Sequence, residues 1–93
     1  MKKEITFGGL TAILNVGDNR AMLVVIDNHL PTELADKLNE SGGLDALEVF
    51  FNDDEQGCIR MSHDLPMDEL ADIVCNAISE IYDTDVSISN ART

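Results

Sequence analysis

The sequence predicts an α+β fold, a two-layer sandwich in which a mainly antiparallel sheet of four to six strands carries two helices on one face. Three observations point to it. Several short segments alternate between apolar and polar residues, which is the period of a strand. Two other segments follow a Leu-Pro pair and have helical spacing. These segments recur in the same order twice within 93 residues, a length typical of one domain, 1–93.

Two parts of the chain resemble each other, and the offset between matching positions grows from 34 to 36 residues. The matches are Gly8–Ala12 with Gly42–Ala46, Leu30-Pro31 with Leu65-Pro66, and Glu33–Asp36 with Glu69–Asp72. Such a pattern predicts a duplicated strand–turn–strand–helix unit, with halves at about 8–41 and 42–83. The alternative is that Leu-Pro helix starts arose twice independently.

In the first half, the alternation of Thr11 to Val16 predicts a strand, and Gly17–Arg20 predicts a turn. The almost wholly apolar Ala21–Ile26 is typical of a central strand covered on both faces. In the second half, residues 47–52 alternate, a turn is expected over Asp53–Gly57, and Cys58–Ser62 alternates again.

Helices are expected at about Pro31–Glu40 and Pro66–Tyr82, because proline is tolerated in a first helical turn. The second has an apolar stripe formed by Leu70, Ile73, Val74, Ala77, Ile78 and Ile81. Lys3–Phe7 and a C-terminal strand at about 86–89, Val86–Ser89, are short alternating segments. We expect each to be an edge strand and a possible site of homodimerisation.

The charge excludes some functions. There are 18 Asp and Glu residues against 6 Lys and Arg, a net charge of -12. Direct nucleic-acid binding is not expected, because the phosphate backbone requires cations. No run of eighteen apolar residues and no signal peptide are seen, so we expect a cytoplasmic protein that does not bind membranes.

The residues that carry chemistry form no convincing site. Cys58 and Cys75 lie outside any CxxC motif and are expected to be reduced, although a bridge between them stays open. His29 and His63 each precede a Leu-Pro pair and are expected to cap a turn. The segment 52–57 resembles the start of a calcium loop but has His63 where glutamate belongs. We therefore expect no enzyme activity, metal or cofactor.

The acidic residues are concentrated in the second half. Residues 40–85 contain 13 acids and a single base, Arg60, whereas residues 1–39 have a net charge of -1. The second helix with its frayed end has five acids and no lysine or arginine, although helix faces usually pair opposite charges. The predicted partner-binding residues are Asp53, Asp54, Glu55, Asp68, Glu69, Asp72, Glu80 and Asp83.

These features favour an interaction protein that masks the basic surface of a nucleic-acid-binding enzyme or complex. In size, charge and lack of a catalytic motif, the chain is similar to small acidic inhibitors of phages and mobile elements, such as anti-CRISPR and anti-restriction proteins. That resemblance implies an inhibitor in the host-cell cytoplasm that imitates nucleic acid. The alternatives are an immunity protein or antitoxin against a basic nuclease toxin, an acidic assembly factor or chaperone, and a merely solvated acidic surface.

Overall fold

The structure, a computed structural model, describes residues 1–25 and 32–90. In chain order the elements are β1 (Lys2–Phe7), β2 (Leu10–Val16), β3 (Arg20–Val25), α1 (Thr32–Asn39), β4 (Leu44–Phe51), β5 (Gly57–His63), α2 (Met67–Tyr82) and β6 (Val86–Asn90). The predicted α+β fold with two helices is confirmed. Pro31, the expected start of the first helix, and His29 lie outside the described residues.

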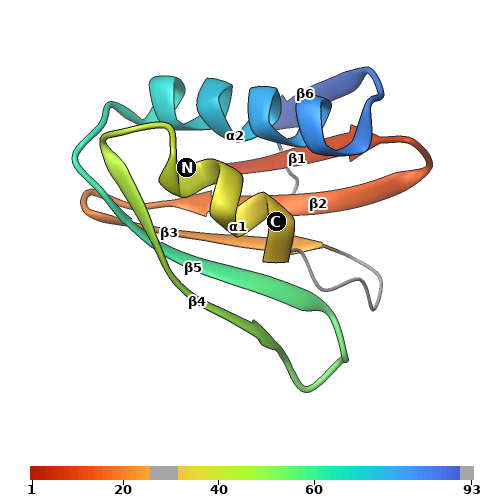
Figure 1. The fold of residues 1–93 in the computed structure, drawn as a ribbon, viewed down its shortest axis with the longest axis horizontal. Helices are drawn as coiled ribbons and strands as arrows, with labels where there is room; N and C mark the ends of the chain where they lie inside the picture. The colour runs from red at the N-terminus through yellow and green to blue at the C-terminus, as the bar shows by residue number, and fades with distance from the viewer. Residues whose placement is uncertain (26–31, 91–93) are drawn as a thin grey trace.

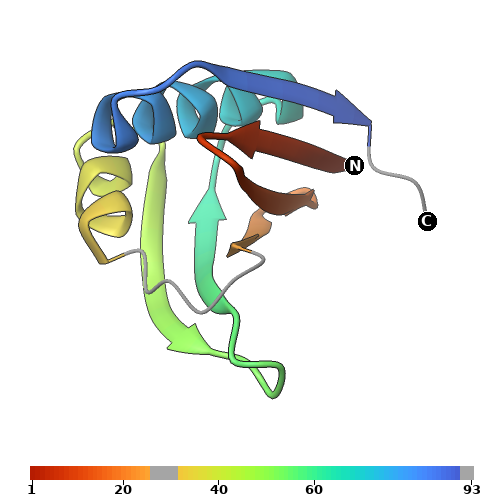
Figure 2. The ribbon, with the colours of Figure 1, turned by 90° about the vertical axis from the view of Figure 1, so that its right-hand side faces the viewer.

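The strands form one sheet in the order β4-β5-β3-β2-β1-β6, and every neighbouring pair is antiparallel. Both helices lie on the same side of this sheet, as the two views show (Figures 1 and 2). No described helix covers the opposite side, which we call the open face. The prediction that the central strand is covered on both faces is wrong in this respect. Met22 and Val24 of β3 point to the open face and are half-buried.

The two halves repeat the same order of elements. The β2–β3 hairpin precedes α1, the β4–β5 hairpin precedes α2, and the second strands of the two hairpins, β3 and β5, pair at the centre. The repeated glycine pairs also share a backbone conformation. Gly8 and Gly9 have φ of 54° and 81°, and Gly42 and Gly43 have φ of 72° and 79°. These values lie in the left-handed region that glycine enters without a steric penalty. The likeness is one of architecture, and the duplication itself stays a prediction.

The prediction for the N-terminal strand is wrong, because β1 lies inside the sheet. Lys3 pairs with Leu14 of β2 on one side and with Asn90 of β6 on the other. The edge strands are β6, as expected, and β4. β6 comes from the C-terminal end of the chain, so no residue near β1 in the sequence indicates that the two strands pair.

The core lies between the sheet and the helices. Ile5, Leu14, Leu23 and Ile59 come from four neighbouring strands, and each is completely buried. Full burial of an aliphatic side chain contributes about 1.5–3 kcal/mol. The helices add Leu34, Ala35, Leu38, Leu70, Ala71, Val74, Ala77 and Ile78, with Ile73 and Ile81 packed partly buried against them. The apolar stripe predicted for the second helix is therefore confirmed.

A β-bulge interrupts the alternation that we expected in residues 47–52. The register of β4 against β5 shifts between Ala46 and Glu48, so Leu47 has no partner residue. Leu47 is 59% exposed and Phe51 47% exposed, while Val49 between them packs against the core. Bulges are common at sheet edges, where they discourage pairing with another chain. The edge at β4 is therefore an irregular one.

Candidate protein-interaction surface

The charge of the two helices is mostly negative. Together α1 and α2 contain six acidic residues and one basic residue, Lys37. The acids are Glu33, Asp36, Asp68, Glu69, Asp72 and Glu80, and all six are exposed. The helices therefore have a net charge of -5, whereas the six strands contain four basic and three acidic residues.

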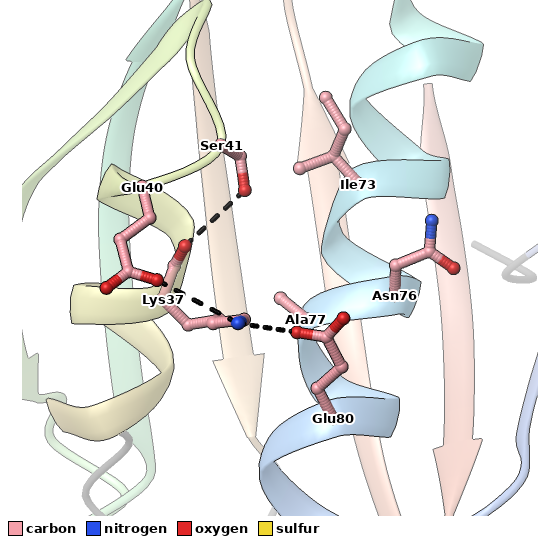
Figure 3. Close-up of a pocket in the computed structure, with 7 residues that line it drawn as sticks. All are labelled: Lys37, Glu40, Ser41, Ile73, Asn76, Ala77 and Glu80. Atoms are coloured by element: carbon pink, nitrogen blue, oxygen red, sulfur yellow. Dashed lines mark hydrogen bonds and ion pairs between the residues drawn. The ribbon is translucent and has the colours of Figure 1, made fainter.

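Lys37 is engaged within the molecule, in a cleft of about 310 Å³ between α1 and α2 (Figure 3). Its Nζ lies 2.6 Å from a carboxylate oxygen of Glu80 and 3.8 Å from one of Glu40. The hydrogen bond and charge of Glu80 raise the pKa of Lys37 above its ordinary value. This pair joins the two helices. It also explains a carboxylate near the C-terminus of α2, where the helix dipole alone disfavours negative charge.

Asp83 likewise has a role within the fold. It is the C-cap of α2 and has φ of 49° and ψ of 51°, in the left-handed region. Aspartate and asparagine enter this region more readily than most other non-glycine residues. Glu80 therefore joins the two helices and Asp83 ends α2, so two of the predicted partner-binding residues have roles within the fold.

The remaining acids of α2 have no such role. Asp68, Glu69 and Asp72 lie in its first half, are exposed, and form what we call the α2 acidic patch. None of the ion pairs found in residues 1–25 and 32–90 includes them. Asp68 and Asp72 lie one turn apart and repel each other. The positive end of the helix dipole offsets part of that repulsion for the first-turn acids.

The acids of the β4–β5 turn lie elsewhere. Figures 1 and 2 both place this turn at the end of the molecule away from α2. Asp53, Asp54 and Glu55 are exposed there. The structure therefore does not bring the two groups of predicted binding residues together.

The turn is organised by an amide side chain. The Oδ1 atom of Asn52 accepts hydrogen bonds from the backbone nitrogens of Asp54 at 3.0 Å and Gln56 at 2.9 Å. Its Nδ2 atom donates to Gln56 Oε1 at 2.9 Å. The side chain that would begin a calcium loop is thus occupied within the turn. Nowhere in the described ranges do three or more His, Cys, Asp or Glu residues form a group suited to a metal.

His63 is a structural residue, as expected. It is 5% exposed, its Nε2 lies 2.8 Å from the carbonyl oxygen of Gly17, and the backbone nitrogen of Leu65 donates to its Nδ1 at 3.2 Å. The Nδ1 atom therefore accepts a hydrogen bond and the Nε2 atom donates one, so both ring nitrogens are occupied within the fold.

The cysteines are both free. Cys58 pairs with Val24 and points to the open face, away from His63 and from α2, which carries Cys75. A bridge between the two thiols is therefore not formed, and Cys58 and His63 do not converge on one site. Burial raises the pKa of both thiols.

Comparisons with family models, curated proteins and solved structures found no match. Among the helices of residues 1–25 and 32–90, none is long and apolar enough to cross a membrane.

Proposed function

We propose that this chain is an acidic protein-binding inhibitor that covers a basic, nucleic-acid-binding surface of another protein. The observation that carries the proposal is the α2 acidic patch, Asp68, Glu69 and Asp72, which is exposed and takes part in no ion pair within the described residues. The lysine of the helices is committed to Glu80 and Glu40 instead.

Repulsion within the patch destabilises α2, and the rest of the fold compensates for it only in part. A like-charge pair one helical turn apart destabilises a helix by about 0.2–0.5 kcal/mol. Asp72 lies beyond the first turn, where the helix dipole has little effect. Cations supplied by a partner would relieve this repulsion and would also accelerate encounter between the two proteins.

A partner of this kind has a surface that ordinarily binds phosphates. Surfaces that bind nucleic acid use lysine and arginine, and the exposed carboxylates of a rigid helix would occupy those cations. The chain itself would make no contact with nucleic acid. The class of inhibitor that we propose is that of the small acidic anti-CRISPR and anti-restriction proteins.

Affinity capture with three baits tests the proposal. The baits are the wild-type chain, Asp68→Asn/Asp72→Asn in the patch, and Asp53→Asn/Asp54→Asn in the distant turn. Both variants raise the net charge by two, from -12 to -10, so they separate the position of the charges from their number. Lysate of the organism that encodes the chain is the source of partners, and captured proteins are eluted with rising salt.

We expect a basic protein on the wild-type and turn baits that elutes at moderate salt. The patch bait should bind it about tenfold more weakly, a loss of about 1.4 kcal/mol. A captured protein that resists high salt, or that binds all three baits equally, would contradict the proposal. The identity of the partner separates the biological classes, because a nuclease toxin identifies an immunity protein and a defence complex identifies an inhibitor.

A further inference from the structure

One row of residues across the open face of the sheet is apolar, although no described helix covers it. Ile13 of β2, Val24 of β3, Cys58 of β5 and Phe50 of β4 are register partners in one row across four adjacent strands. Met22 follows Val24 on the same face. Sheets with one solvated face normally alternate apolar and polar residues, and β3 departs from this with Ala21–Val25 apolar throughout.

The charges of this face are balanced, unlike those of the helices. The residues whose register turns them to the open face include three bases and three acids. They are Lys2, Arg20, Arg60, Glu4, Asp45 and Glu48. Arg60 and Glu48 pair across β5 and β4 at 2.6 Å. The strand residues of this face therefore have no net charge.

The balance of charges favours a second copy of this chain as the occupant. A second copy of this chain has a net charge of -12 and would be repelled by the acidic helical layer. On the neutral open face it would meet apolar side chains and both signs of charge. A basic partner, by contrast, is attracted to the helices and gains nothing electrostatically from this face.

The shape of the face also suits a twofold interface, in which one patch must provide both a protrusion and a recess. Leu47 is 59% exposed and borders a hollow with Arg20, Arg60 and Ser62. A second hollow of about 320 Å³, beside Arg20 and Arg60, includes Met22 in its lining.

We infer that two copies of this chain form a homodimer by packing their open faces together. The strand edges are not the contact in this arrangement, and the acidic helical layers point outward on both sides of the dimer. The inference rests on the sheet and is independent of the function proposed for the helices.

Sedimentation equilibrium over a range of concentrations tests the dimer, with circular dichroism as the check on folding. The variants are Val24→Glu at the centre of the apolar row, Arg20→Glu at its exposed rim, and Lys3→Glu as the control. Arg20 and Lys3 undergo the same change of charge. Lys3 and Glu4 are neighbours in β1, so their side chains point to opposite faces of the sheet. Lys3 points to the helix-bearing face, where its Nζ donates to Asn90 Oδ1 at 2.5 Å.

We expect the wild-type chain and Lys3→Glu to have twice the mass of one 10.2 kDa chain. Arg20→Glu should raise the dissociation constant at least about tenfold, because it gives each open face a charge of -2. If Val24→Glu does not fold, Arg20→Glu remains a sufficient test, because its exposed side chain is not required by the core. A wild-type monomer at all concentrations, or a dimer that Arg20→Glu leaves unchanged, would overturn the inference.

Discussion

The glycine pair before β4 provides a quantitative test of the fold. Gly43 has φ of 79°, and a Cβ added there would lie 2.7 Å from Cδ2 and 3.0 Å from Cγ of Leu65. Gly42 has φ of 72°, and an added Cβ would meet nothing within 4 Å. Alanine at either position is strained by the left-handed backbone, but only at Gly43 does it also collide with a side chain that packs against the core.

The expected costs follow from these two terms. The left-handed backbone costs alanine about 1–2 kcal/mol, so Gly42→Ala should lower the free energy of unfolding by that amount. Overpacking against Leu65 adds about 1–3 kcal/mol, so Gly43→Ala should cost ~2–5 kcal/mol. In a chain of this size a difference of 1 kcal/mol corresponds to about 4–8 °C in Tm.

The assay is urea and thermal unfolding of both variants followed by far-ultraviolet circular dichroism. A third measurement repeats Gly43→Ala in a Leu65→Ala background, where removal of the Leu65 methyl groups should reduce the cost to that of Gly42→Ala. Equal destabilisation by Gly42→Ala and Gly43→Ala would refute the placement of Leu65 over Gly43.

Three further predictions follow from the side chains. Because Glu80 raises the pKa of Lys37, their ion pair stabilises the fold fully below pH 10.5 and loses this effect as the pH rises through the higher pKa of the folded state. In urea unfolding measured over a range of pH, Lys37→Met should therefore lose less stability at alkaline pH than the wild-type chain does. His63→Ala should cost about 1–3 kcal/mol by the same assay, because two part-buried hydrogen bonds to the backbone are lost, and an unchanged midpoint would contradict that role. Native alkylation followed by mass spectrometry should label half-buried Cys75 before Cys58, which is 2% exposed, and the reverse order would contradict the burial of Cys58.

Local sequence predicted the elements whose signals are local. The stripe from Leu70 to Ile78 identified α2, and the alternation of Thr11 to Val16 identified β2, because each pattern reflects burial against one layer. The Gly17–Arg20 turn was also predicted correctly, and the Gly17 nitrogen donates to the Arg20 carbonyl at 2.7 Å.

The errors concern contacts between distant parts of the chain. The pairing of Lys3 with Asn90 spans 87 residues, so nothing near β1 indicated that it lies inside the sheet. The bulge at Leu47 depends on the register of β4 against β5, which alternation alone does not determine.

The sequence predicted which residues of the candidate site are acidic, but not how the fold arranges them in space. Sequence identified the acids of α2 but grouped them with Asp53 and Asp54, which the fold places at the far end of the molecule. The ion pair between Lys37 and Glu80 also escaped prediction, because it joins two helices that are separate in the sequence. The charge of a segment can be read from its residues, but the face that carries the charge depends on packing.

The salt dependence of association tests the central claim most directly. The association rate constant of the captured partner is measured against ionic strength for the wild-type chain, Asp68→Asn/Asp72→Asn and Asp53→Asn/Asp54→Asn. We predict a steep fall with salt for the wild-type and turn variants, and a slower, less salt-dependent association for the patch variant. Three identical salt dependences, or association that does not change with salt, would contradict the assignment of the α2 acidic patch as the binding surface.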